Sequence, residues 1–353
     1  MTTLEHLMGN QPADRFYRGG SKIRDFRADD AAAATGDRVP EDWVGSTTTL
    51  FGDGQVGLSR LANGTTLRDA VAQNPQHWLG PEHVAAFGPD TRLLVKLLDA
   101  GERLPVHLHP TDAFALDHVG TQHGKAEAWY ILEGGTVHLG FTREIGEEEL
   151  RGWVETQNVA AIMAAMHVIE VNAGDSIYVP PGLPHAIGAG IFLVEVQQPE
   201  DLSILLEWQD FAIDGPADGH LGIGFETALQ ATDVRAWTSA QINELVVRGG
   251  ANGHTLAASS AEYFRASRVD VTASTAFDSG FGVLVVLSGK GTLTPSVPGA
   301  PQIELSAGDT LLLAYALGSF TLDGELAVLR CQPPVSSAGS ASPASPASPA
   351  SPA

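Results

Sequence analysis

The sequence feature that most constrains the fold is a pattern of histidines, one glutamate and glycines in two separated parts. Its residues, in chain order, are Gly101, His107, His109, Glu127 and Gly134, followed by Gly174, the turn Pro180-Pro181-Gly182-Leu183-Pro184 and His185. Histidines at positions i and i+2 of a strand point to the same face, because side chains alternate along a strand. A carboxylate and a third histidine from neighbouring strands would complete a set that suits zinc or another divalent transition metal. The pattern therefore predicts neighbouring strands that enclose a metal ion.

Composition limits the classes of protein and partner. The chain has 353 residues, enough for one large or two ordinary domains. Its net charge of −22 argues against nucleic acid as a partner, because phosphate backbones bind basic faces. No apolar run is long enough to cross a membrane, and the first residues carry no secretion signal. The single cysteine, Cys331, cannot form an internal disulfide, so we expect a cytoplasmic protein. The sequence carries no indication of the oligomeric state.

Hydrophobic patterning places strands and helices in the first two thirds of the chain. The continuous apolar run at 93–98 predicts a buried strand, and alternating segments predict further strands at 127–133, 136–141, 168–172 and 191–197. Residues 146–166 begin with three glutamates and continue with apolar spacings of three and four, which predicts an inserted helical segment. Short helices are also expected within 66–90 and 225–247.

The last third repeats the pattern of the metal-bearing part without its histidines. A second run of short strands is expected over 263–331, and residues 305–313 repeat the strand, Gly-Asp, strand order of residues 171–179. No histidine follows His254. We therefore expect a degenerate second copy of the metal-bearing unit, which binds no metal and serves packing. Residues 336–353, with their Ser-Pro-Ala repeats, predict a disordered tail.

Five segments together resemble a known family. They are Leu94-Val95-Lys96-Leu97-Leu98-Asp99, Val106-His107-Leu108-His109-Pro110, Gly124-Lys125-Ala126-Glu127-Ala128-Trp129-Tyr130, Pro180-Pro181-Gly182-Leu183-Pro184-His185 and Glu195-Val196-Gln197-Gln198-Pro199. In this order, over roughly residues 90–210, they are similar to type I mannose-6-phosphate isomerases of the cupin superfamily. The resemblance implies a mostly β protein with two cupin (jelly-roll) β-barrels, an inserted helical segment and a degenerate second barrel.

The resemblance also implies a division of the chain. Residues 1–90 would form an N-terminal extension that packs on the barrels, and residues 91–215 would form the metal-binding barrel with its helical insert at 146–166. Residues 216–335 would form a helical connection and the second barrel without metal.

The family's metal ligands map onto four positions of this chain. They are His107, His109, Glu127 and His185, where His107 stands in place of a family glutamine. An imidazole nitrogen is at least as good a zinc ligand as an amide oxygen, so the substitution preserves the site. We expect one divalent metal ion per chain, with Zn²⁺ as its identity.

Other residues near this motif are candidates for catalysis and substrate binding. Lys125 and Glu195 are expected to be catalytic, and Lys125, Gln197 and Trp129 are expected to contact the substrate. Glu195 and Gln197 share one face of a strand if its side chains alternate, and that face would be the one toward the metal cavity.

Two departures from the family concern recognition of a phosphate group. Pro105 stands where the family has a serine that contacts the substrate phosphate, and Leu205 stands where the family has a catalytic arginine. Leucine can neither pair with a phosphate nor stabilise an enediolate. An unphosphorylated sugar is therefore the substrate that these two positions favour.

The resemblance implies an aldose–ketose isomerase of carbohydrate metabolism that interconverts mannose and fructose, or their 6-phosphates, through an enediol. A metal would polarise the carbonyl, and a base would move the proton between C1 and C2. Two alternatives remain open at this point: a metal oxygenase using the same three histidines and glutamate, and a sugar-binding cupin without turnover.

Overall fold

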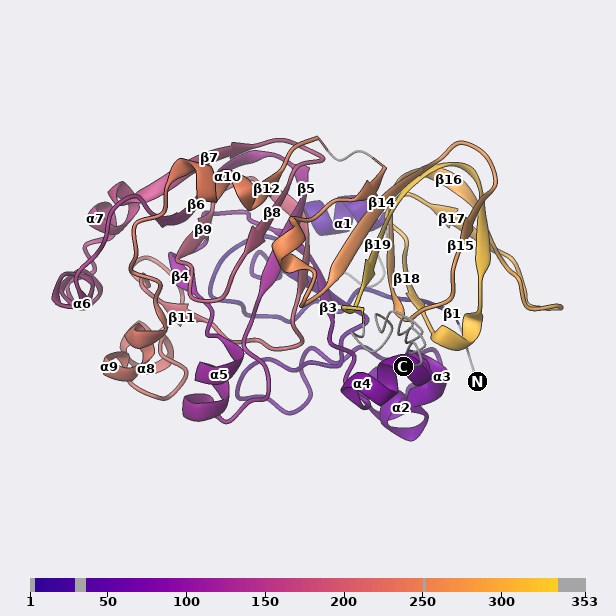
Figure 1. Ribbon diagram of the computed structural model, residues 1–353, viewed down its shortest axis with the longest axis horizontal. Coiled ribbons are helices and arrows are strands. Elements are labelled where there is room, and N and C mark those ends of the chain that lie inside the picture. The colour runs from indigo at the N-terminus through magenta and orange to yellow at the C-terminus, as the bar shows by residue number, and fades with distance from the viewer. Residues whose placement is uncertain (1–3, 29–35, 250–251, 336–353) are drawn as a thin grey trace, which may run out of the picture.

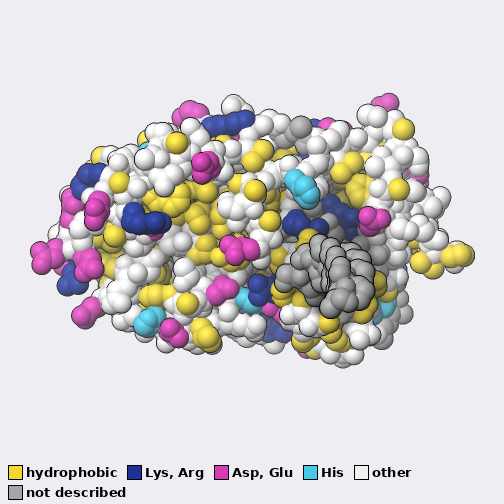
Figure 2. All heavy atoms as spheres, in the orientation of Figure 1, with side chains coloured by type: hydrophobic (Ala, Val, Ile, Leu, Met, Phe, Trp, Pro, Cys, Tyr) yellow, Lys and Arg dark blue, Asp and Glu magenta, His cyan; other side chains and the backbone are white. Residues whose placement is uncertain are grey.

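The computed structural model describes residues 4–28, 36–249 and 252–335, and the tail predicted at 336–353 lies outside them. The described chain is rich in antiparallel strands, which form three sheets. Two of these sheets lie in the half of the molecule at the left of Figure 1, and the third forms the half at the right. Acidic and basic side chains intermingle over the face shown in Figure 2.

The first half contains a six-stranded and a five-stranded sheet. The six-stranded sheet has the order β12 (Val246–Val247), β8 (Ser176–Val179), β5 (Glu127–Glu133), β10 (Phe192–Gln197), β3 (Leu94–Asp99) and β2 (Glu41–Val44). The five-stranded sheet has the order β11 (Ile204–Leu205), β4 (His107–Leu108), β9 (His185–Ile187), β6 (Gly135–Phe141) and β7 (Met166–Val171). The strands predicted for this part of the chain are confirmed to within two residues at their ends.

The strand β3 shows how one strand serves both the core and the cavity. All six of its residues are buried. Val95 and Leu97 belong to the largest apolar cluster, and Lys96 between them points to the opposite face because side chains alternate. The register aligns Lys96 with Glu195 on β10, and Glu195 with Trp129 on β5. A row of polar and aromatic side chains therefore crosses one face of this sheet.

The second half is built on a single eight-stranded sheet. Its path is β1 (Leu4–His6), β18 (Thr310–Leu313), β16 (Gly282–Pro295), β19 (Phe320–Gln332), β14 (Arg265–Val271) and β13 (Gly253–His254), with β15 (Thr275–Phe277) on β19 and β17 (Ile303–Ser306) on β16. The prediction of short strands is wrong for β16 and β19, which have 14 and 13 residues. The first strand of the chain completes this sheet, because β1 pairs with β18.

The helices are short, and most of them lie toward the rim of the molecule, whereas α1 lies near its middle (Figure 1). They are α1 (Ser21–Arg27), α2 (Leu67–Gln73), α3 (Pro75–Leu79), α4 (Pro81–Phe87), α5 (Asp112–Phe114), α6 (Glu147–Glu155), α7 (Val159–Ala164), α8 (Gly215–Asp218), α9 (Phe225–Ala228) and α10 (Ser239–Glu244). The predicted insert at 146–166 contains two helices, α6 and α7, and its last residue already belongs to β7. Gln157, with a φ of 49°, separates the two helices.

The mostly β fold is confirmed, whereas the jelly-roll connections and the domain boundaries stay predictions. Two segments of the predicted N-terminal extension, β1 and β2, pair with strands β18 and β3 respectively. Within the described residues, no helix is long and apolar enough to span a membrane.

Candidate metal centre

Alternation along β4 places two histidines on one face of the five-stranded sheet. Val106 and Leu108 pack into the apolar cluster of this half, so His107 and His109 point the other way. Across the ladder, His107 is directly opposite His185 on β9. The Pro-Pro-Gly turn before β9 is tied to the same place, because the Gly182 N–H donates to the His109 carbonyl oxygen at 2.7 Å. Gly182 has a φ of 86°, which favours glycine.

Each of the three imidazoles is oriented by a backbone carbonyl. The Nδ1 atoms of His107, His109 and His185 lie 2.8, 2.6 and 2.8 Å from the carbonyl oxygens of Pro105, Leu202 and Leu183 respectively. A carbonyl oxygen can only accept, so each Nδ1 carries the proton. A neutral ring held in this way presents an Nε2 atom with a free lone pair, as metal-binding histidines do.

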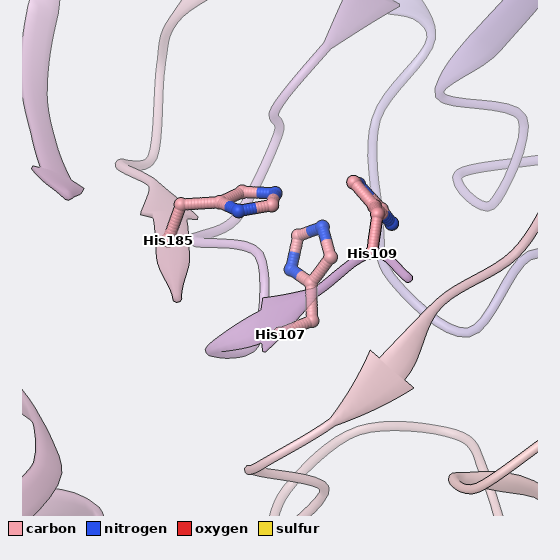
Figure 3. A group of neighbouring side chains, drawn as sticks. All are labelled: His107, His109 and His185. Carbon is pink, nitrogen blue, oxygen red and sulfur yellow. The ribbon is translucent and has the colours of Figure 1, made fainter. Parts of the chain in front are cut away.

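The three rings converge in the interior (Figure 3). Nitrogen atoms of His107, His109 and His185 lie within 4.8 Å of one another, and all three side chains are buried. This is the one such group of possible metal ligands among the described residues. The Nε2 atoms of His109 and His185 are buried and have no hydrogen-bond partner. Buried polar atoms without a partner are costly, and a cation among them would remove that cost.

Glu127, on β5 of the opposite sheet, completes the group. Its carboxylate oxygens lie 2.9 Å from Nε2 of His109 and 3.2 Å from Nε2 of His185. Lone pairs that face carboxylate oxygens at these distances repel each other unless a cation lies among them. Three imidazoles and a carboxylate are also a donor set that binds divalent transition metals. The residues present therefore fit a divalent metal ion.

Burial and neighbouring charges keep these groups in the protonation state that a metal needs. Burial, and then the charges of His185 and His109, lower the pKa of His107 well below its ordinary value. Burial, and then the charge of Lys125, lower the pKa of His109 to about 3. Burial opposes ionisation of Glu127, but Lys125 and His109 outweigh it and hold its pKa well below the usual range. Two neutral imidazoles and an anionic carboxylate result.

Lys125 and Glu195 adjoin the group in the same cavity. The Lys125 Nζ lies 2.9 Å from Glu127 and 3.4 Å from Glu195. Burial, and next the nearby Glu127 charge, raise the pKa of Glu195 above its ordinary range, against the opposing charge of Lys125. Both residues line a small cavity of about 30 Å³ with His107 and Glu127. Both predicted catalytic residues therefore lie beside the candidate ligands.

Gln197 and Trp129 lie close to the group, but neither lines that cavity. The Trp129 Nε1 donates to Glu127 at 3.1 Å, and its ring packs 5.6 Å from the His185 ring. The Gln197 Nε2 donates to the carbonyl oxygens of Gln198 and Glu200, and its Oε1 is buried without a partner. These contacts show Trp129 holding Glu127 in place. Substrate contact by either residue stays a prediction.

The two positions that depart from the family behave differently. Pro105 lines the small cavity and supplies the carbonyl that orients His107. Leu205 lies opposite His107 on β11 and lines a neighbouring cavity of about 460 Å³. Neither offers a side-chain hydrogen-bond donor.

Sequence reasoning missed a cluster of charged residues in the wall of the cavity. Arg15, Glu41, Lys96 and Asp201 all line it, together with Tyr17. Lys96 Nζ lies 3.1 Å from Glu41 and 3.8 Å from Asp201, and Arg15 Nε donates to Glu41 at 3.0 Å. Lys96 lies within the resembling segment at 94–99, and its polar character inside an apolar run was a signal that could have found it. Arg15 and Glu41 lie outside every motif.

Fold and site together define a class, that of β proteins with a buried centre of three histidines and a glutamate between two sheets. A scan against models of protein families found no match. Mannose-6-phosphate isomerase of Streptococcus mutans serotype c is 30% identical over 264 residues, covering 72% of this chain and 79% of that protein. Mannose-6-phosphate isomerase ManA of Bacillus subtilis is 27% identical over 322 residues, covering 87% and 92% respectively.

Solved structures agree on the fold. The mannose 6-phosphate isomerase of Bacillus subtilis superimposes with a TM-score of 0.72 at 21% identity, covering 94% of this chain and 100% of that one. A phosphomannose isomerase variant from Salmonella typhimurium gives 0.70 at 15% identity, with the same coverage. This chain belongs to the mannose-6-phosphate isomerase family, and it is an isomerase.

Proposed function

We propose that this protein is an aldose–ketose isomerase that interconverts mannose and fructose, with or without a 6-phosphate, and that it uses one zinc ion. The ligands would be His107, His109, Glu127 and His185. The observation that carries the proposal is the pair of unpartnered Nε2 atoms, on His109 and His185, that face the Glu127 carboxylate. Family membership supports an isomerase over the oxygenase and over the sugar-binding protein without turnover.

The reaction needs a polarised carbonyl and a group that moves a proton between C1 and C2. A bound zinc ion supplies the polarisation, as a Lewis acid for the carbonyl oxygen. Glu195 is the residue of this chain proposed to take and return the proton, because its carboxylate lies in the cavity wall beside the ligands. Lys125, 3.4 Å from Glu195, is placed to stabilise negative charge on the substrate oxygens and on Glu195. Lys125 and Glu195 are buried, and the lower dielectric of the interior strengthens both interactions.

The substrate class within this family is the open part of the proposal. Two arginines that could otherwise pair with a phosphate are engaged elsewhere: Arg103 pairs with Glu207, and Arg143 pairs with Glu149 on the surface. We therefore propose that an unphosphorylated sugar is accepted at least as well as its 6-phosphate. A cytoplasmic location belongs to the proposal too, supported by the one cysteine, Cys331, which is free and buried.

The test is incubation of purified protein, first stripped of metal and then loaded with one zinc ion per chain, with mannose, fructose and their 6-phosphates. Exchange between the two sugars is followed by NMR in deuterated water. We expect interconversion and incorporation of solvent deuterium at C1 or C2, which marks an enediol.

Oxygen uptake measured in parallel controls for the oxygenase. Consumption of oxygen with no aldose–ketose exchange would overturn the proposed function. Binding of sugars without exchange by the zinc-loaded protein would favour the sugar-binding alternative.

A further inference from the structure

Arg15 is a largely buried cation in the wall between two cavities. It lines the small cavity that contains His107 and Glu127, and also the 460 Å³ cavity that contains Leu205. Phe16, Asp201 and Ser203 also line both cavities, so the two cavities adjoin at this point. The larger cavity adjoins that of the metal centre and, at about 460 Å³, has room for the rest of a sugar.

The backbone holds Arg15 firmly at this junction. Its N–H donates to the Arg38 carbonyl oxygen at 3.1 Å. A few residues later, the Asp99 carboxylate at the end of β3 accepts from the N–H groups of Gly20 and Lys22 at the start of α1. These bonds hold the main chain of the segment beside β3, and the Arg15 side chain itself is held by its hydrogen bond to Glu41.

The guanidinium of Arg15 has hydrogen-bond donors to spare. Its Nε donates to Glu41 at 3.0 Å, whereas its contact with Asp201 is 3.8 Å, too long for a hydrogen bond. Among the described residues, no hydrogen bond is made by its two terminal nitrogens. A buried arginine with unused N–H groups against a cavity is a ready donor for the oxygen atoms of a ligand.

The charge of Arg15 is already balanced by its neighbours. Arg15 and Lys96 share the carboxylates of Glu41 and Asp201, at distances between 3.0 and 3.8 Å. The two cations therefore face two anions, and the cluster has no excess positive charge. Such a wall suits neutral hydroxyl groups, which need donors and acceptors, better than a phosphate dianion, which needs net positive charge.

We propose that Arg15 contacts the substrate where the two cavities meet, and that it donates hydrogen bonds to sugar hydroxyl groups and so determines specificity. The inference deepens the proposed function and rests on it. It gives this chain a donor from its N-terminal segment, on the side of the cavity where position 205 supplies none.

The first arm of the test replaces Arg15 with methionine, which keeps the length of the side chain and removes its donors. Mannitol is the probe, because a polyol presents the hydroxyl groups of a sugar but has no carbonyl to isomerise. We expect Arg15→Met to bind mannitol at least about tenfold more weakly than wild type in calorimetry, and to lose kcat/KM for the sugars to a similar extent. Arg18→Met is the matched control. Arg18 lies three residues away, is 58% exposed and pairs with Asp37, so wild-type affinity is expected.

The second arm removes one of the balancing carboxylates. Asp201→Asn keeps the shape of the side chain and leaves Arg15 and Lys96 with an unmatched charge. We expect the ratio of affinities for mannitol 6-phosphate and mannitol to rise about tenfold or more in this variant. This arm also decides the matter if Arg15→Met fails to fold.

Wild-type mannitol affinity in Arg15→Met, no mannitol binding by wild type, or an unchanged affinity ratio in Asp201→Asn would each overturn the inference. Mannitol binding that depends on Arg15, without exchange of any sugar by the zinc-loaded wild type, would overturn the proposed function and leave the inference standing.

Discussion

The two halves of the molecule share one kind of turn, but the side chains that they bury differ. The first half buries charged and polar side chains on the inner faces of its sheets, among them Lys96, Lys125, Glu127 and Glu195. The buried residues of the second half are mainly apolar, among them Leu293, Phe320, Leu322 and Val328, and Thr310 and Arg330 are the larger polar exceptions. Ser-Ala-Gly-Asp at 306–309 and Asn-Ala-Gly-Asp at 172–175 make similar turns in both halves. The same turn therefore occurs in both halves, and the buried side chains decide which half can do chemistry.

The largest expected effect follows from removing one ligand of the polar half. His185→Ala deletes an imidazole that no other described side chain can replace, so we expect metal content to fall from one ion per chain to nearly none. Elemental analysis after dialysis checks this. His254→Ala, at an exposed histidine outside the cavity, is the control. One zinc ion per chain in His185→Ala, or two in wild type, would contradict the view that the first half binds one metal ion and the second half binds none.

The next effect concerns the apolar half. Phe320 is 1% exposed and stacks on Phe277 with ring centroids 5.0 Å apart. Phe320→Ala should therefore lower the free energy of unfolding by about 3–5 kcal/mol, measured by urea denaturation. Val297→Ala, at a residue that is 47% exposed, should change it by less than about 0.5 kcal/mol. Loss of bound metal from folded Phe320→Ala protein would show that the second half does more than pack.

A third experiment restores a cation to the polar half. Leu205→Arg places a guanidinium in the 460 Å³ cavity, where a charge-assisted contact with phosphate is worth about 1.5–3 kcal/mol. We expect the ratio of kcat/KM for mannose 6-phosphate to that for mannose to rise by a factor of about 10 to 150. Leu205→Met, which adds no charge, should leave the ratio unchanged. Efficient wild-type turnover of mannose 6-phosphate alone would contradict the expected substrate range.

The smallest effect is a pH dependence confined to the polar half. Burial opposes ionisation of Glu41, but the charges of Arg15 and Lys96 and the hydrogen bonds from Tyr17 and Trp43 outweigh it, so the pKa of Glu41 lies well below 4.5. A lowered pKa in the folded state contributes stability above the unfolded value, and that stability is lost as the pH falls below it.

The stability advantage of wild type over Glu41→Gln should therefore shrink between pH 5 and pH 3, by at most about 1.4 kcal/mol per pH unit. Urea denaturation at each pH measures it. The exposed pair of Glu149 with Arg143 gives the control, and Glu149→Gln should show a much smaller change. An advantage that does not vary with pH would mean that the Glu41 cluster is not ionised as described.

Local patterns were enough to predict the candidate ligands and most strands. His107 and His109 are two residues apart, so strand alternation predicts that both side chains lie on one face. The prolines and the glycine at 180–184 predict the turn that comes before His185. Metal binding by these residues stays a prediction. The sheet register could not be predicted from the sequence, although it places Glu195 opposite Lys96, which lies 99 positions earlier in the chain.

Two misses have clear physical reasons. Glu41 reaches the cavity through the ladder of β2 on β3, which pairs it with a residue 57 positions away, and Arg15 is held there by Arg38, Glu41 and Asp201. Those contacts leave no periodic trace in the sequence. The length of β16 was missed because Gly289 and Gly291 are typical of a turn. Instead, both lie in the strand, where an added Cβ at Gly289 would lie 2.0 Å from the Glu325 carbonyl oxygen.

The pairing of β1 with β18 has a consequence for how the molecule is made. His6 is aligned with Leu311, so β1 can reach its neighbour only after β18, some 300 residues later, has left the ribosome. Until then β1 is an unpaired strand, and such edges invite pairing with other chains. Pairing so distant in sequence is also slow, because the closure of a long loop precedes any gain from contact. Completion of the eight-stranded sheet is therefore the folding step most exposed to aggregation, and the polar half can fold before this sheet is complete.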